Sequence, residues 1–219
     1  MQALTLGPGA GRGLEILCLG AHADDLEIGC GGTVLALLQA PRPVAVHWVV
    51  FSAPGERASE AHHGAALFLQ AAATREVCVM DFRDGFFPFQ GGTLKERFEE
   101  LKGRLAPDLI LTHCRHDRHQ DHRLVSELTW STFRHHLILE YEIPKYDGDL
   151  GAPNCYVPLD DALCRRKTQY LMTAFPSQQA KAWFTEDTFR GLMRLRGVEA
   201  RAPEGFAEAF YGHKLVLQP

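Results

Sequence analysis

The chain has 219 residues, of which 46% are hydrophobic, enough for one full-sized core. It carries 23 basic and 27 acidic residues, and its formal net charge of -4 excludes the general positive field that attracts nucleic acid or anionic membranes. No apolar run approaches the ~18 residues that span a bilayer, and the N-terminal segment lacks the pattern of a signal peptide. We expect one domain over residues 1–219, with residues 1–13 as a loose segment, and small-molecule partners.

The six cysteines form no Cys-x-x-Cys pair, and the chain is too long to depend on disulfides. They are typical of reduced thiols, which predicts a cytoplasmic protein. The sequence leaves the oligomeric state open, a homo-oligomer included.

Short apolar runs alternate with helical patterns along the first half of the chain. The predicted strands are 15–20, 44–51, 76–82 and 108–112, and the predicted helices are 33–40, 59–73 and 94–105. Gly29, Gly31 and Gly32 predict a tight turn that opens the first helix.

The same alternation continues less regularly towards the C-terminus. We expect helices at 123–136, 160–173 and 185–197, a strand at 137–143, a turn-rich loop at 144–153 and a closing segment at 206–217. Alternating strands and helices predict a single Rossmann-like α/β domain, with a mainly parallel sheet covered by helices on both faces. Sites in such folds form at the carboxyl ends of the strands.

One such strand end carries Gly20-Ala-His22-Ala-Asp24-Asp25. His22 offers an imidazole nitrogen and Asp25 a carboxylate oxygen, a donor mixture that suits Zn²⁺, while Asp24 is left to act as a base. Histidine and aspartate are common at strand ends, so this stretch alone does not establish a metal site.

A second polar cluster follows the strand at 108–112 and strengthens the metal hypothesis. It contains His119, Asp121 and His122, so that His22, Asp25 and His122 complete the three ligands of a catalytic zinc site. Such a site lowers the pKa of bound water towards ~7. We expect Asp121 to hydrogen-bond an imidazole of the cluster, and His113 and His116 to be ordinary polar or supporting residues.

An acidic residue followed by Gly-x-Gly also occurs where methyltransferases bind S-adenosylmethionine. That binding mode needs an apolar strand directly before the glycines and an acidic residue at the next strand end, but residues 21–26 are largely polar and the second strand ends in Phe51-Ser52-Ala53. The methyltransferase is therefore retained only as an alternative.

These clusters resemble the motifs of the LmbE-like or PIG-L zinc-dependent N-deacetylases, which remove acyl groups from amino-sugar conjugates. The first family motif appears as Ala21-His-Ala-Asp-Asp-Leu-Glu27 with Gly31-Gly-Thr33, and the second as His119-Gln-Asp-His122. Weaker similarities are Gly55-Glu-Arg57 with Glu60, Asp84-Gly85, Ser177-Gln178 and Ala207-Glu-Ala-Phe210. Ala23 replaces the usual proline, which removes a rigid turn but no functional group.

The resemblance implies zinc, or another divalent ion such as Fe²⁺, bound by His22, Asp25 and His122. It implies Asp24 as general base and His119 as the group that steadies the tetrahedral intermediate, with Asp121 in the same catalytic cluster. Arg57 and Asp84 match positions that hold the sugar.

The resulting hypothesis is hydrolysis of an N-acetyl amide on a GlcNAc-type sugar, with zinc-activated water attacking the amide and Asp24 as general base. The sugar conjugate could be free, nucleotide-linked or lipid-linked. The alternatives are the methyltransferase, a non-catalytic sugar-binding protein, and an amidase for a non-sugar acyl-amine conjugate. Segments 86–89 and 141–156 are candidates for the pocket wall, although their aromatic residues also fit a core or a solvated loop.

Overall fold

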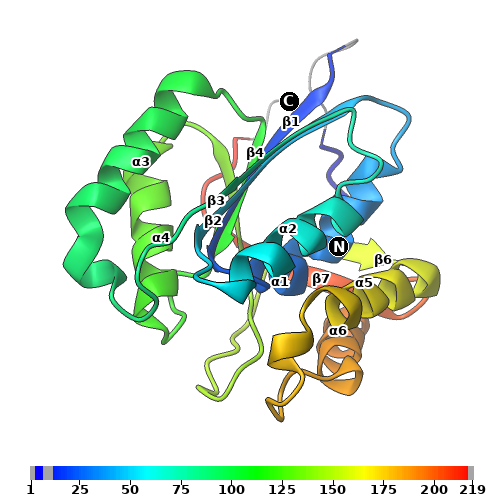
Figure 1. The fold of residues 1–219 in the computed structure, drawn as a ribbon. Coiled ribbons are helices and arrows are strands. Elements are labelled where there is room, and N and C mark those ends of the chain that lie inside the picture. Colours follow the sequence, from blue (N-terminus) through cyan, green and yellow to red (C-terminus); the bar gives the residue numbers. More distant parts are fainter. Residues whose placement is uncertain (1–2, 7–11, 217–219) are drawn as a thin grey trace.

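The computed structural model describes residues 3–6 and 12–216, which form one α/β domain around a seven-stranded sheet (Figure 1). Of the predicted loose segment 1–13, residues 1–2 and 7–11 lie outside the described residues. The strand order is β3-β2-β1-β4-β5-β7-β6. The first five strands in this order run parallel, and β7 is antiparallel to both of its neighbours.

The strands are β1 (Leu14–His22), β2 (Val44–Ser52), β3 (Thr74–Val79), β4 (Leu109–His113), β5 (Leu137–Tyr141), β6 (Cys155–Leu159) and β7 (Phe206–Gly212). The α-helices are α1 (Asp25–Leu38), α2 (Glu56–Phe68), α3 (Gly91–Arg104), α4 (Gln120–Thr132), α5 (Asp161–Ala174) and α6 (Glu186–Ala200). Two short 3-10 helices cover Phe87–Gln90 and Pro176–Gln178.

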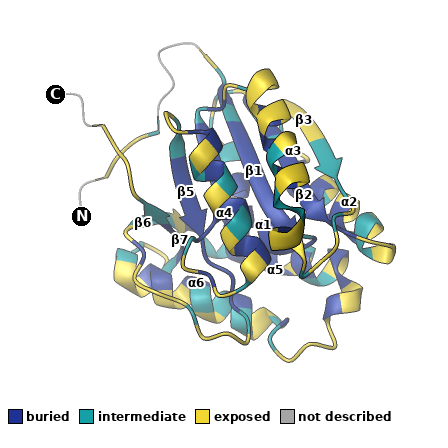
Figure 2. Ribbon diagram, turned by 90° about the vertical axis from the view of Figure 1, so that its left-hand side faces the viewer, coloured by how far each residue is buried: buried dark blue, intermediate teal, exposed yellow. Residues whose placement is uncertain are grey.

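Helices cover both faces of the sheet, as expected. In Figure 1, α3 and α4 lie on one side, while α1 and α2 lie on the other with α5 packed against them. Each face has its own apolar core: Trp48 and Phe68 belong to the one beneath α1 and α2, and Phe51 and Phe98 to the one beneath α3 and α4. The central strands are accordingly buried along most of their length, whereas the outer helix surfaces are exposed (Figure 2). Among the described residues, none of the helices combines the length and apolar character needed to cross a bilayer.

The predicted strands and helices are mostly confirmed, with shifted ends. The helix predicted at 59–73 is α2, which begins at Glu56 and ends at Phe68. It ends early because the backbone N–H of Ala73 already donates to the carbonyl of Val44, which sets the start of β3. β3 consequently covers 74–79 rather than 76–82.

Strand β6 was not predicted from the sequence. It contains Pro158, and proline removes one donor from the backbone ladder but is tolerated at an edge. Among the described strands, β6 lies at the edge of the sheet and pairs only with β7, with Pro158 opposite Ala207, so the missing donor is tolerated.

The predicted glycine turn is wrong, because Gly29, Gly31 and Gly32 lie inside α1. A Cβ atom on Gly29 would lie 2.2 Å from the ring of Tyr141, and one on Gly31 would lie 2.4 Å from the ring of Phe68. The glycines therefore allow the helix to pack closely on its neighbours. No ligand can approach a backbone covered in this way, so the S-adenosylmethionine alternative is not supported.

Gly32 accommodates a buried ion pair from the C-terminal part of the chain. Glu208 on β7 accepts hydrogen bonds from the backbone N–H groups of Gly32 (2.7 Å) and Thr33 (2.6 Å), and its carboxylate lies 2.6 Å from the ammonium of Lys167. Lys167 also donates to the carbonyl of Ile28. Helix α1 is thus tied directly to β7 and α5.

We predict opposite effects for alanine at two helical glycines. Gly29→Ala should destabilise the fold by about 1–3 kcal/mol, because the new methyl group overlaps the buried Tyr141 ring. Gly191→Ala in α6 meets no neighbouring atom within 4 Å and should stabilise it by about 0.5–1 kcal/mol through helix propensity. Urea denaturation of both variants measures the difference, and equal effects would contradict the packing argument.

Candidate active site

The two polar clusters meet because their strands are neighbours. β1 ends at His22 and β4 at His113, and the two strands pair in parallel. The loops that follow them therefore open at the same edge of the sheet. Ala23, which replaces the family's proline, donates its N–H to the carbonyl of Ser52 at 3.2 Å. The turn after β1 is thus anchored to β2 by a bond that proline could not form.

Three donor atoms converge at this edge. Nδ1 of His22 lies 3.2 Å from Nε2 of His122 and 3.4 Å from Oδ2 of Asp25, and the latter two atoms are 3.5 Å apart. Tetrahedral zinc with ligands at 2.0–2.1 Å separates its donor atoms by about 3.3–3.4 Å. The predicted trio therefore has the spacing of a tetrahedral metal site with a fourth position left for another ligand.

Each histidine of the trio is oriented by a buried carboxylate. Nε2 of His22 lies 3.1 Å from Oδ2 of Asp121, and Nδ1 of His122 lies 2.9 Å from Oδ2 of Asp117. Such carboxylates fix the ring orientation and the tautomer of metal-ligating histidines. The predicted bond from Asp121 to an imidazole is thus present, and Asp121 also accepts the backbone N–H groups of Gly85 and Phe87.

Asp25 and His122 have the protonation states that metal ligands need, whereas His22 has to release a proton first. Burial opposes protonation of His22, but hydrogen bonds to Asp121 and two other carboxylates raise its pKa well above the usual value. Burial opposes ionisation of Asp25, but His122, His113 and His22 outweigh it and hold the pKa of Asp25 well below its usual value. Burial, reinforced by His113, lowers the pKa of His122 to about 4, so this ring is neutral at pH 7 and keeps a lone pair for a ligand bond.

Asp24 lies beside the trio in an unusual backbone conformation. Its φ of 94° falls in the left-handed region, which residues other than glycine rarely adopt and which is often found at functional sites. Burial raises the pKa of Asp24 to about 7, although the neighbouring Arg57 opposes the shift. A carboxylate with this pKa is well matched to accept a proton near neutral pH.

Arg57 holds Asp24 in place through a network that the sequence did not predict. Its guanidinium donates to Oδ2 of Asp24 at 2.8 Å and also to the Ala23 carbonyl, Glu60 and Ser177. Glu60 in turn accepts the backbone N–H of Ser177 at 2.8 Å. The 3-10 helix at Pro176–Gln178 is thereby joined to the site. The role of Arg57 in sugar binding stays a prediction.

His119 and Asp84 complete the predicted set. His119 is the N-cap of α4, and its Nδ1 accepts the backbone N–H of Asp121 at 3.3 Å, which leaves the ring proton on Nε2. Burial and the charge of His22 lower the pKa of His119. Asp84 lies 3.1 Å from Nε2 of His22 and is largely exposed, with 65% of its side chain accessible.

The supporting role expected for His113 fits its position, since its buried ring stacks on that of His122 and its Nε2 accepts the N–H of Ala21 at 2.9 Å. His116 is exposed. The contact of Asp117 with His122 was not predicted from the sequence. One signal was available, because Asp117 is an acidic residue between the end of β4 and His122. A histidine that binds a metal through one nitrogen needs a hydrogen-bond acceptor for the other.

The cluster opens into a cavity of about 450 Å³. Its lining residues come from six separate segments: His22, Asp24, Ser52, Pro54, Arg57, Asp84, His119, His122, Ile143, Lys145, Tyr146, Asp147, Gln178, Lys181 and Trp183. The expectation for segment 141–156 is met by Ile143 and residues 145–147. In segment 86–89, Phe87 is buried in the core, and Phe86 and Phe89 are exposed without lining this cavity.

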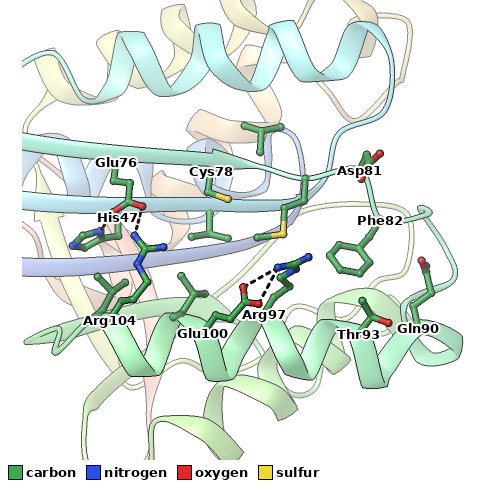
Figure 3. Close-up of a pocket in the computed structure, with 15 residues that line it drawn as sticks. His47, Glu76, Cys78, Asp81, Phe82, Gln90, Thr93, Arg97, Glu100 and Arg104 are labelled. Atoms are coloured by element: carbon green, nitrogen blue, oxygen red, sulfur yellow. Dashed lines mark hydrogen bonds and ion pairs between the residues drawn. The ribbon is translucent and has the colours of Figure 1, made fainter.

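A larger hollow of about 590 Å³ lies between β3 and α3, away from the cluster (Figure 3). Its rim carries charged side chains that pair with one another, including Glu76 with Arg104 at 2.5 Å and Arg97 with Glu100 at 2.8 Å. None of the predicted site residues lines it. The chemistry-bearing groups therefore belong to the smaller cavity.

A buried carboxylate with a raised pKa beside three convergent nitrogen and oxygen atoms, at the carboxyl edge of a parallel sheet, is an arrangement that suits metal-assisted hydrolysis. The chain belongs to the PIG-L family: the family model described as GlcNAc-PI de-N-acetylase matches residues 17–133, more than half of its length. The match includes both polar clusters, and it identifies the chain as a member of a deacetylase family.

Solved structures with the same fold include enzymes of different chemistry. The 4-carboxy-2-hydroxymuconate hydratase GalB from Pseudomonas putida KT2440 is 16% identical, with a TM-score of 0.75 over 94% of this chain and 98% of that one. The N,N'-diacetylchitobiose deacetylase from Pyrococcus horikoshii is 18% identical, with a TM-score of 0.64 over 91% and 83%. Teicoplanin deacetylase Orf2, solved in a zinc-inhibited form, is 13% identical, with a TM-score of 0.67 over 90% and 97%. No curated protein matches the sequence.

We predict that Glu60→Gln destabilises the protein in a pH-dependent way. Burial raises the pKa of Glu60, but the bonds from Ser177 and Arg57 outweigh it and leave the pKa below its usual value. As the pH falls, Glu60 is therefore protonated in the unfolded state before it is protonated in the folded state. The stabilisation from its charge is present above pH ~4.5 and is lost as the pH falls through the lowered pKa.

The variant should lose about 1–3 kcal/mol at pH 7 and progressively less in acid, as measured by urea denaturation from pH 3 to 7. Glu56→Gln, at an exposed position of the same helix, is the matched control. A loss that stays constant across this pH range would refute the role of the Glu60 charge.

Proposed function

We propose that the protein removes the N-acetyl group from an amino-sugar conjugate of the GlcNAc type. The observation that carries this proposal is the convergence of His22 Nδ1, Asp25 Oδ2 and His122 Nε2 to within 3.5 Å of one another, with Asp24 beside them in an open cavity. Family membership and the deacetylases among the solved structures support the same reaction.

His22, Asp25 and His122 would hold a divalent ion, zinc in the first instance or another such as Fe²⁺. The donor set fits, because it combines two imidazole nitrogens with one carboxylate and has two further carboxylates orienting the rings. When bound, such an ion polarises the amide carbonyl and makes water more acidic.

Asp24 would accept the proton of the attacking water and then return it to the departing amine. Its position suits this exchange, since Arg57 holds one carboxylate oxygen at 2.8 Å. His119 would donate its Nε2–H to the oxyanion of the tetrahedral intermediate. A neutral His119 can make this bond, because the N–H of Asp121 occupies Nδ1 and leaves the proton on Nε2.

The remainder of the cavity would receive the sugar and the group attached to it. Asp84 is placed to accept hydrogen bonds from sugar hydroxyl groups, because it is exposed and lies next to His22. Trp183 and Tyr146 offer aromatic faces in the cavity wall for a pyranose ring.

We expect Asp24→Asn to lower kcat by about 10²–10⁴-fold, because the amide cannot accept the proton. Bound metal should be retained, since Asp24 is outside the donor trio. Acetate release and elemental analysis on the same sample test both statements. Near-native kcat would rule out Asp24 as the base, and loss of metal would assign it a different role.

His122→Ala should abolish metal binding. In the native protein, zinc at 100 times its Kd should raise the free energy of unfolding by about 2.7 kcal/mol. The variant should show no such increase in thermal melts with and without zinc. His116→Ala, an exposed histidine of the same segment, should respond as the native protein does. Full zinc content in His122→Ala would exclude it as a ligand.

The proposed reaction is tested by a screen of metal-loaded protein against free, nucleotide-linked and lipid-linked N-acetylhexosamines, with acetate as the readout. An N-acylated amine without a sugar tests the amidase alternative. Because the fold also supports a hydratase, water addition to an unsaturated carboxylate is assayed in parallel. Acetate from an amino sugar supports the proposal, and acetate from none of them contradicts it.

A further inference from the structure

Lys145, in the loop after β5, carries a buried positive charge next to the donor cluster. Only 9% of its side chain is exposed, although the residue lines the cavity. Its ammonium lies 3.0 Å from Oδ1 of Asp117 and 2.6 Å from Oδ2 of Asp149, and both carboxylates are almost fully buried. Lysine is seldom buried unless it is paired, so these contacts account for its position.

Asp117 connects this lysine to His122. One oxygen of the carboxylate binds Nδ1 of His122 at 2.9 Å, and the other accepts both the ammonium of Lys145 and the backbone N–H of His119 at 2.7 Å. A continuous chain of short polar contacts thus runs from the cavity wall through Asp117 to a donor of the proposed metal site.

Asp149 is the second carboxylate that contacts Lys145. Its Oδ2 accepts the backbone N–H of Arg118 at 2.7 Å in addition to the ammonium of Lys145. The loop that carries Tyr146 and Asp147 is therefore fastened to the segment preceding α4. Without the lysine, Asp117 and Asp149 would face each other as two buried anions with no cation between them.

We propose that Lys145 is a positioning residue for the metal site: it holds Asp117 against His122 and couples that ligand to the loop forming the cavity wall. The inference rests on the donor trio of the proposed function and does not depend on which bond is hydrolysed.

The change in metal affinity on replacing Lys145 distinguishes a positioning role from a simple charge effect. The two predict changes in opposite directions. A positive charge near a cation site repels the cation, so its removal alone would tighten metal binding. Loss of the contact that orients Asp117 would instead weaken metal binding. Removing a carboxylate that hydrogen-bonds a metal-ligating histidine typically weakens metal binding by about 10–100-fold.

The experiment measures the Kd of Zn²⁺ by chelator competition and the visible spectrum of the Co²⁺-loaded protein. Lys145→Met should weaken Zn²⁺ binding about tenfold and alter the Co²⁺ spectrum, while Lys145→Arg should restore most of both. If Lys145→Met does not fold, Lys145→Gln, which lacks the charge but keeps a donor, gives the same comparison. Melting of the metal-free proteins monitors folding. An unchanged or tighter Kd overturns the inference.

Two further variants test whether Lys145 affects Zn²⁺ binding through Asp117. Asp117→Asn should weaken Zn²⁺ binding by about 10–100-fold, and adding Lys145→Met to it should cost little more, because the lysine acts through Asp117. Fully additive losses would contradict this route. Lys181→Met removes a positive charge from the same cavity wall without touching Asp117 and should not weaken binding.

The outcomes also separate this inference from the proposed reaction. If the native protein binds Zn²⁺ and Lys145→Met weakens it, but no substrate releases acetate, the reaction is wrong and the inference stands. If acetate is released while Lys145 variants bind Zn²⁺ as the native protein does, only the inference fails. A native protein that binds no divalent ion would refute the donor trio and this inference together.

Discussion

The parallel pairing of β1 with β4 is the constraint on which the candidate site depends. It places the ends of two strands, about 90 residues apart in sequence, side by side, so that His22 and Asp25 face His122. On one face, α1 lies close to its neighbours because its glycines leave room for the rings of Tyr141 and Phe68. The hydroxyl of Tyr141 donates to the carbonyl of Leu19 at 2.8 Å, which ties β5 back to the end of β1.

The site divides into groups suited to chemistry and groups that hold them. The donor trio and Asp24 are surrounded by Asp117, Asp121 and Arg57, each of which bonds one of them directly. These supporting groups come from different elements and are themselves anchored, Asp121 by two backbone N–H groups and Arg57 by Glu60. Several buried charges thus balance one another within a small volume. Such an arrangement holds the clustered side chains in position without a ligand, and preorganisation of this kind is a main source of the catalytic advantage of enzymes.

The sequence was sufficient for the alternation of strands and helices and for the two polar clusters, because apolar periodicity and strand-end histidines are local signals. The sequence was not sufficient where contacts between residues far apart in the chain determine the local structure. Gly29 and Gly31 had the local pattern of a turn, but tertiary packing against Tyr141 and Phe68 makes them helical. Strand β6 was not predicted, and its Pro158 is acceptable because that strand lies at the sheet edge. Glu60 could not be assigned a partner because its contact with Ser177 forms only once the chain is folded, and the contact of Asp117 with His122 had only the weak signal of an acidic residue before that histidine.

Strand β3 ends the sheet on one side, and this has a consequence for association between copies of the chain. Among the described strands, β3 pairs only with β2, so one row of its backbone groups is available to another strand. Free edges of this kind are where chains aggregate, and charged side chains are the usual protection. Arg75 and Glu76 stand on this strand, and Glu76 is held by both Arg104 and His47. A strand added here would have to bury or displace these charges. The ion pairs of Figure 3 therefore protect the molecule against edge-to-edge association.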